Sequence, residues 1–208
     1  MNTEEKYKVK ENYKQPFPDI NSQFWHENIT GVLINYYKNL MKGKIAEFGC
    51  NNGISTAKVS RYEDVEQVVG FDINEEALKE AEEKLLPQIP ETLNKVSFVK
   101  TNLTKIDWQK NYFDFAFTIH TIEHIYPEDI EEAISEMSSL LKSNAYFLVN
   151  LPDKNSYRWE PTHVFHPDLN DLNNLFVKNG FEVIESYYDE RGGQVGHSRN
   201  ITALYKKL

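Results

Sequence analysis

The sequence predicts an α/β fold in which short buried strands alternate with helices around one open sheet. Residues 45–48 (Ile-Ala-Glu-Phe) read as a buried strand that ends in a glycine-bounded turn, and a helical pattern begins directly after Gly53. Five such strand–helix units follow one another, with strands at 45–48, 67–71, 96–100, 113–119 and 145–150. Two last runs, 181–188 and 200–205, have no helix between them and are typical of a closing hairpin.

The remaining elements follow from the spacing of apolar residues. Residues 1–19 are polar and rich in tyrosine, which indicates an arm or lid. Apolar residues recur at three- and four-residue spacing from 20 to 41 and predict an amphipathic helix before the first strand. Further helices are expected from Asn74 to 86, from Pro127 to 141 and from Asp168 to a stop at Gly180.

Length and composition limit the possible classes of protein. A chain of 208 residues, 40% of them hydrophobic, buries one sizeable core and is expected to form one main domain. No apolar run reaches membrane-spanning length, and the N-terminus lacks the apolar segment of a signal peptide, so we expect a soluble cytoplasmic protein without a membrane partner. The single Cys50 excludes an intramolecular disulfide. A formal charge of −9 disfavours nucleic acid as a partner.

The turn after the first strand carries the clearest indication of a ligand. It has two glycines, Gly49 and Gly53, where a dinucleotide fingerprint requires three in the pattern G-x-G-x-x-G. Glu47 precedes it, and a carboxylate at that point repels a phosphate and attracts a cation. Cys50 lies inside the turn, where it is most simply explained as a small residue that fills a tight space. The pattern therefore favours a cationic ligand over a pyrophosphate.

A second acid lies at the end of the second strand. Asp72 follows Glu47 by 25 residues, and an acid at the end of the strand beside a glycine turn can accept hydrogen bonds from a ribose diol. The alternative is that Asp72 only caps the helix that begins near Asn74. Taken together, the first acid, the turn and Asp72 predict an adenosine-type ligand.

These residues resemble a known family. Glu47-x-Gly49-x-x-x-Gly53 resembles motif I of the class I S-adenosylmethionine-dependent methyltransferases, residues 113–119 resemble motif IV, and the likeness extends over residues 42–208. It implies a Rossmann-like, doubly wound sheet of seven strands with an antiparallel last strand, in a three-layer sandwich. It also implies two parts: an N-terminal arm and helix, 1–41, acting as a lid, and a cofactor-binding domain, 42–208.

The resemblance also implies a set of cofactor-binding residues. Asn102 departs from the family's usual Asp, although its amide still offers a carbonyl acceptor to the adenine amino group. The expected set comprises Glu47, Phe48, Gly49, Cys50, Asn51, Gly53, Asp72, Ile73, Asn102, Leu103 and Ile119.

Candidate catalytic residues gather after the fourth and fifth strands: His120, Glu123 and His124 follow the fourth, and His163 comes after the fifth. A hydroxyl acceptor needs a base or a metal, whereas an amine needs only to be unprotonated. His120 or His163 as general base is the favoured hypothesis, purely structural histidines come next, and a divalent metal ion is the least favoured of the three. For the metal hypothesis, His120-x-x-Glu123-His124 resembles the Glu-x-x-Glu-His metal sites of small RNA 2'-O-methyltransferases and ubiquinone-pathway O-methyltransferases, with His120 in place of the first Glu.

The acceptor is predicted less directly. If the sixth strand is parallel to the others, the loop 189–199 lies at the cofactor end of the sheet, and Arg191, His197 and Arg199 become substrate-binding candidates; otherwise the loop is an exposed turn. Residues 160–164 (Glu-Pro-Thr-His-Val) resemble a segment of bacterial small-molecule and sugar methyltransferases. We therefore expect methyl transfer to a hydroxyl, or an amine, of a small molecule or sugar. The alternatives are a metal-dependent RNA 2'-O-methyltransferase and a non-catalytic protein that binds an adenosyl ligand. The sequence leaves the oligomeric state open.

Overall fold

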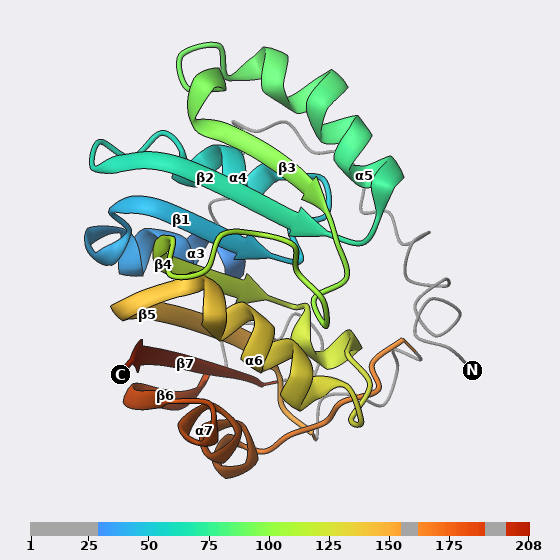
Figure 1. Cartoon of the computed structure of the whole chain (residues 1–208), viewed down its shortest axis with the longest axis vertical. Coiled ribbons are helices and arrows are strands. Elements are labelled where there is room, and N and C mark those ends of the chain that lie inside the picture. Colours follow the sequence, from blue (N-terminus) through green and yellow to red (C-terminus); the bar gives the residue numbers. More distant parts are fainter. Residues whose placement is uncertain (1–28, 155–161, 190–198) are drawn as a thin grey trace. The chain divides into compact units, whose positions relative to one another are not determined.

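The strands of the N-terminal half form a parallel sheet. The computed structural model describes residues 29–154, 162–189 and 199–208 (Figure 1). The chain divides into two compact units, residues 1–102 and 103–208. In the first unit β2 (Val65–Asp72) pairs in parallel with both β1 (Gly43–Phe48) and β3 (Val96–Lys100). The carboxyl ends of these three strands therefore lie at the same edge, as predicted for a ligand-binding crevice.

The helices of the first unit pack on one another and on β2. α3 (Ile29–Tyr37) continues into a 3-10 turn, η2 (Lys38–Leu40), and contacts α4 (Ile54–Val59), which packs on β2. The helix expected over 20–41 is thus confirmed from residue 29 onward, while residues 1–28 lie outside the described part of the chain. The remaining segments are α5 (Glu75–Glu80), a π-helical turn η3 (Ala81–Leu85), and the 3-10 turns η4 (Leu86–Gln88) and η5 (Leu93–Lys95).

The strands of the second unit form a mixed sheet. β4 (Phe113–Ile119) pairs in parallel with β5 (Leu141–Pro152), β5 pairs antiparallel with β7 (Asn200–Lys207), and β7 pairs antiparallel with β6 (Phe181–Asp189). β6 therefore runs parallel to β5, and β6 ends at Asp189 and β7 begins at Asn200 beside Pro152, at the carboxyl end of β5; residues 190–198 lie outside the described part of the chain. The strand order through the sheet is β3-β2-β1-β4-β5-β7-β6. The predicted α/β fold, with seven strands and an antiparallel last one, is confirmed.

Aromatic side chains build the core of the second unit beneath α7 (Leu169–Lys178). The Phe176 and Tyr205 rings stack with centroids 4.1 Å apart, and Phe147 and Phe181 pack around them. The buried Tyr205 hydroxyl donates to Asn173 Oδ1 at 2.9 Å, so this core leaves the phenol satisfied. α7 begins at a capping box between Asp168 and Asp171, as the sequence predicted for a helix entered at Asp168.

Two element boundaries in the second unit differ from the prediction. α6 (Ile130–Leu140) begins three residues after Pro127, because residues 126–129 form a separate turn in which the Asp129 amide donates to the Tyr126 carbonyl at 2.9 Å. β5 begins at Leu141 and not at 145, and the register shifts opposite this early part while Asn144 adopts a φ of +67°. An irregular start of this kind interrupts the alternation that marks a strand in sequence.

Gly53 is required by both its backbone and its surroundings. Its φ is +75°, and a Cβ there would lie 2.4 Å from two carbons of the Phe98 ring. We predict that Gly53→Ala lowers the free energy of unfolding by about 2–4 kcal/mol, measured by urea denaturation, because strain and a clash add. Gly180→Ala is the matched control: φ is +83° but no atom lies within 4 Å of the added carbon, so only strain of about 1–2 kcal/mol remains. Equal losses in the two variants would contradict the clash.

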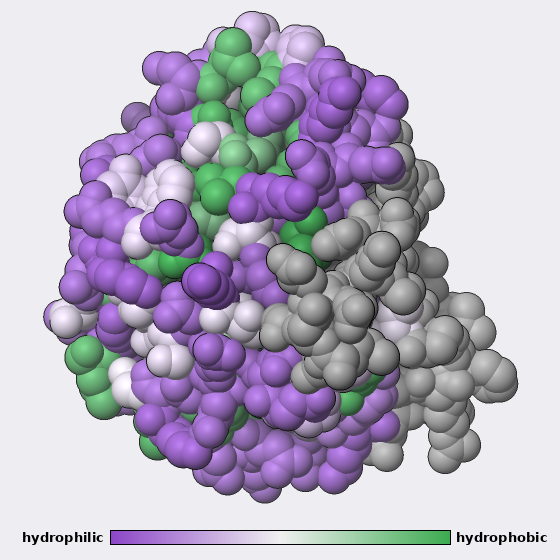
Figure 2. Space-filling view, turned by 45° about the vertical axis from the view of Figure 1, so that its right-hand side comes forward, coloured by the Kyte–Doolittle hydropathy of each residue, from purple (hydrophilic) through white to green (hydrophobic). Residues whose placement is uncertain are grey.

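Hydrophilic residues dominate the face of the molecule shown in Figure 2, and apolar residues appear there in small groups. Among the described residues, no helix is long and apolar enough to cross a membrane. The proposed division of the chain at residue 41 into a lid and a main domain stays a prediction.

Candidate cofactor and acceptor sites

The glycine turn is tied to the end of β2 by its own backbone. The Gly49 and Cys50 amides both donate to the Phe71 carbonyl, at 2.8 and 3.1 Å, and the Asn51 amide donates to Asp72 Oδ2 at 2.6 Å. The next two amides also have acceptors within the turn, Asn51 Oδ1 for Asn52 and the Cys50 carbonyl for Gly53. Every N–H from 49 to 53 is therefore satisfied inside the protein, unlike the phosphate-binding turns whose amides point at the ligand.

Asp72 braces this turn. Besides the Asn51 amide, it accepts the Asn74 amide on Oδ1 at 2.8 Å, so each of its oxygens accepts a backbone donor. The helix cap is a different residue, because the Asn74 side chain accepts the Ala77 amide at 3.1 Å and so caps α5. Each carboxylate oxygen offers a second lone pair, which leaves Asp72 able to accept hydrogen bonds from a ribose diol.

Glu47 is buried at the end of β1. Only 6% of its surface is exposed, and its Oε2 accepts a hydrogen bond from the fully buried Thr56 hydroxyl. Burial raises the pKa of Glu47 to about 8; the nearby negative charge of Asp72 adds to this rise, and the Thr56 hydrogen bond opposes it. The two acids that border the turn thus differ in their hydrogen-bond donors: Asp72 accepts the backbone amides of Asn51 and Asn74, whereas Glu47 is hydrogen-bonded by the hydroxyl and the backbone of Thr56.

In the second unit, His120 and Glu123 form a pair at the end of β4. His120 Nδ1 lies 3.3 Å from Glu123 Oε1, and the Glu123 side chain is fully buried. Burial pushes the pKa of Glu123 upward, but the hydrogen bond and the charges of His120 and His124 outweigh it and hold the pKa below its usual value. His120 adopts a φ of +55°, held by its amide hydrogen bond to the Asn150 carbonyl at 2.9 Å. Such backbone strain in a non-glycine residue is typical of functional sites.

The segment after β5 is anchored on the turn η6 (Ile122–His124). The Glu123 carbonyl accepts the amides of Val164 and Phe165, at 2.8 and 3.1 Å. His124 Nδ1 lies 3.1 Å from the Thr162 carbonyl, and because a carbonyl can only accept, Nδ1 carries the proton. In a neutral ring the lone pair is then on Nε2. This arrangement fixes the tautomer in the way that outer partners orient metal-ligating histidines.

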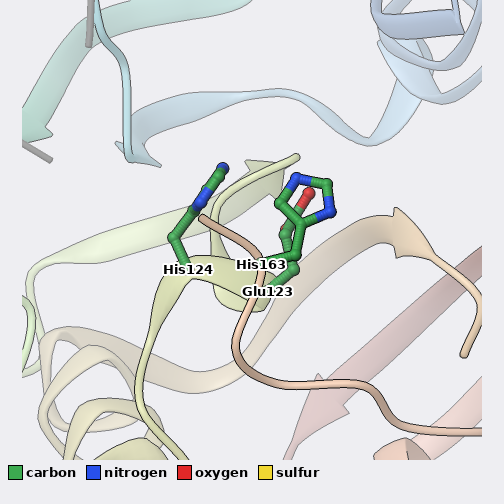
Figure 3. A group of neighbouring side chains, drawn as sticks. All are labelled: Glu123, His124 and His163. Atoms are coloured by element: carbon green, nitrogen blue, oxygen red, sulfur yellow. The ribbon is translucent and has the colours of Figure 1, made fainter. Parts of the chain in front are cut away.

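Glu123, His124 and His163 bring three ligand atoms within 4.8 Å of one another. Figure 3 shows their side chains rising from the η6 turn and the segment after β5 and pointing to the same side. The His124 and His163 rings meet edge to face, with centroids 4.7 Å apart. Among the residues that the structure describes, Glu123 Oε2 is buried and has no hydrogen-bond partner, which is costly for a carboxylate oxygen that binds nothing. The donor set of two imidazoles and one carboxylate is one that divalent metal ions take.

Comparison with known proteins identifies the family. A family model described as a methyltransferase domain matches residues 46–149, which is half of the chain. The chain belongs to this methyltransferase family. The predicted class, an S-adenosylmethionine-dependent enzyme of class I, is thereby confirmed, and the family implies binding of S-adenosylmethionine.

Solved structures share the fold of the methyltransferase at low sequence identity. The [4+2]-cyclase SpnF superposes with a TM-score of 0.73 at 17% identity, over 91% of this chain and 85% of that one. A methyltransferase from Methanosarcina mazei superposes with a TM-score of 0.71 at 20% identity, over 87% of this chain and 99% of that one. The methyltransferase domain of bacterial CtHen1-CN superposes with a TM-score of 0.68 at 19% identity, over 90% of this chain and 100% of that one. None of the curated proteins matches the methyltransferase in sequence.

The structure places the predicted cofactor residues of the methyltransferase in two groups. Those from Glu47 to Asn102 lie at or just after the carboxyl ends of β1, β2 and β3 in the first unit. Leu103 and Ile119 belong to the second unit, and their cofactor role stays a prediction. Within the second unit, Glu123, His124 and His163 come together as a cluster, with His120 attached to it through Glu123.

Arg199 is the one predicted substrate residue in the described part of the methyltransferase. Its Nε donates to the buried Asp153 at 2.5 Å, and its guanidinium lies 3.6 Å from the Tyr188 ring centroid. A structural role in joining β5, β6 and β7 thus accompanies the predicted one. Arg191 and His197 lie outside the described residues.

Sequence reasoning missed two groups in the methyltransferase. Thr56, the hydrogen-bond donor to Glu47, lies nine residues further on in the first turn of α4, where a threonine looks like an ordinary helix residue. The Thr162 carbonyl, which orients His124, carries no sequence signal because any residue supplies a carbonyl.

Proposed function

We propose that the methyltransferase transfers the methyl group of S-adenosylmethionine to a hydroxyl of a small molecule or sugar, with an amine as the less favoured acceptor. The observation that carries this proposal is the joint presence, in the second unit, of the His120–Glu123 pair and the Glu123–His124–His163 cluster. An amine nucleophile would need neither, because it attacks once unprotonated, whereas a hydroxyl must lose its proton as the methyl group is transferred.

His120 is the proposed general base. Its Nδ1 faces the ionised Glu123 Oε1 and so carries a proton, which leaves the lone pair of the neutral ring on Nε2. Glu123 would stabilise the imidazolium that forms after His120 takes the acceptor proton, as the carboxylate does in other histidine–acid pairs. His163, the other base candidate, belongs to the cluster and is assigned there.

The cluster fits a divalent metal ion better than the sequence suggested. Glu123 Oε2 has no hydrogen-bond partner in the described part of the chain, and His124 presents the nitrogen that its bond to the Thr162 carbonyl leaves unprotonated. Glu123, His124 and His163 would hold the ion. A divalent ion bound there supplies Lewis-acid polarisation of the acceptor hydroxyl. Glu123 would then serve both features, using one oxygen for His120 and the other for the cluster.

Metal binding can be tested without an acceptor. We predict that Mn²⁺ or Zn²⁺, added to protein stripped with chelator, raises the melting temperature of the wild type by several degrees, because an ion that binds only the folded state stabilises it. His124→Ala and His163→Ala should abolish the shift, while His166→Ala, which removes an exposed imidazole that contacts the backbone carbonyl of His163 at 3.1 Å and does not belong to the cluster, should retain it. No shift in the wild type, together with turnover that survives chelator, would leave His120 as the base of a metal-free enzyme.

The acceptor class is tested by a methyl-transfer panel of small hydroxyl compounds, sugars, amines and short RNAs. Transfer to hydroxyl compounds or sugars supports the proposal, and transfer to RNA alone overturns it. The net charge of −9 argues against RNA. Cofactor binding with no product on any acceptor would favour a non-catalytic protein, a possibility that the cyclase neighbour keeps open because one fold hosts several chemistries.

A further inference from the structure

The pocket around Glu47 is built by residues of the first unit that lie close to Gly70. Glu47 and Gly70 are register partners on β1 and β2, so the missing side chain of Gly70 opens space next to the Glu47 carboxyl. Thr56, Cys50 and the Phe98 ring occupy that space: a Cβ on Gly70 would lie 2.9 Å from Thr56 Oγ1, 2.7 Å from Cys50 Sγ and 2.9 Å from Phe98 Cδ1. The Glu47 carboxyl is thus buried beside the Thr56 hydroxyl that donates to it, next to the space at Gly70 that Cys50 and Phe98 also fill.

The ionisable groups that act on Glu47 are acidic. Asp72 acts on it from the end of β2, and Cys50 in the turn has a pKa raised by burial and by the charges of Asp72 and Glu47. α4 contributes the Thr56 hydroxyl; its one charged residue, Lys58, is two positions further on and so projects from a different side of the helix. Because these surroundings oppose a second negative charge, Glu47 with its pKa of about 8 holds a proton at neutral pH.

We infer that Glu47 releases this proton to solvent when the sulfonium cation of S-adenosylmethionine enters, so that the cofactor is recognised by a carboxylate which it ionises itself. The O–H bond of the carboxyl group breaks, the proton passes to buffer, and the positive charge of the sulfonium replaces it. The Thr56 hydroxyl, which donates to Oε2, is the positioning group that stabilises the ionised form. The inference rests on cofactor binding at the glycine turn.

The same exchange distinguishes the two forms of the cofactor. S-adenosylhomocysteine, the product, has the same nucleoside and amino acid parts but a neutral thioether in place of the sulfonium. A neutral thioether does not stabilise an ionised Glu47. The carboxyl group therefore binds a proton from solvent again after methyl transfer. The product is then held without this charge interaction, which favours its exchange for fresh cofactor.

Titration calorimetry at about pH 6.5, in buffers of different ionisation enthalpy, tests the inference by counting protons. In the wild type, binding of S-adenosylmethionine should release roughly one proton more than binding of S-adenosylhomocysteine. In Glu47→Gln the two ligands should release the same number of protons. This variant also measures the protons that the amino group common to both ligands gains or loses. The Kd for S-adenosylmethionine should fall about tenfold from pH 6 to pH 7 in the wild type and stay within about twofold in Glu47→Gln.

Thr56 variants separate positioning from simple packing. Thr56→Val should weaken binding of S-adenosylmethionine about tenfold and of S-adenosylhomocysteine by less than about twofold, and Thr56→Ser, which keeps the hydroxyl, should restore wild-type binding. Equal proton counts for the two ligands in the wild type would overturn the inference and leave the methyltransferase assignment intact. If neither ligand binds, the glycine turn is not a cofactor site, and both the proposed function and this inference are wrong.

Discussion

Replacing Glu123 with glutamine is expected to lower the turnover number at least about 100-fold while the Kd for S-adenosylmethionine changes by less than about twofold. The loss combines two effects, since Oε1 orients His120 and the carboxylate also belongs to the cluster with His124 and His163. General-base catalysis alone is worth about 10²–10⁴-fold, and the amide neither stabilises an imidazolium nor binds a metal ion as a carboxylate does. Turnover on the best acceptor of the panel, with calorimetry of the cofactor, measures both quantities.

Two further variants make this result specific. Glu132→Gln makes the same change at an exposed position of α6 and should retain full turnover. His120→Asn removes the imidazole but keeps a residue that tolerates positive φ, so turnover should fall while the metal-dependent melting shift remains. Wild-type turnover in Glu123→Gln, with the fold intact by circular dichroism, would exclude both the base pair and the cluster from the reaction.

The parts of the fold and site that sequence predicts are those set by local patterns. Residues 45–48, the two glycines and Asp72 lie on consecutive elements, and parallel pairing of β1 with β2 brings their ends together. Asp72 also shows the limit of this reasoning. Its alternative role as a helix cap was reasonable from spacing, but whether Asp72 or Asn74 caps α5 depends on where the helix axis begins, and here Asn74 does so.

Features that depend on contacts between distant residues could not be predicted. His124 and Thr162 are 38 residues apart, and their hydrogen bond depends on how the segment after β5 returns to η6. The positive φ of His120 depends on its hydrogen bond to Asn150 in the neighbouring strand. For this reason the sequence offered His120 and His163 as alternatives for the general base, whereas we propose separate roles for them, His120 in the pair with Glu123 and His163 in the cluster.

Removing the carboxylate of Asp72 should weaken cofactor binding by about 1–3 kcal/mol, which is roughly a 5- to 150-fold rise in Kd. Two effects contribute to the loss in Asp72→Ala: the ribose loses its acceptor, and the turn loses the brace on the Asn51 amide. Asp64→Ala, at the exposed residue just before β2, is the matched control and should bind normally.

A pair of nucleosides separates the ribose contact of Asp72 from its bracing of the turn. If Asp72 holds the ribose diol, the wild type prefers adenosine to 2',3'-dideoxyadenosine, and Asp72→Ala loses that preference, as expected when two interacting groups are removed in turn. If Asp72 only braces the turn, Asp72→Ala raises the Kd of both nucleosides by the same factor, and the ratio of the two Kd values is unchanged. The ratio is decisive because a loosened turn affects both ligands alike, whereas a lost hydrogen bond affects only the ligand that carries the hydroxyl groups.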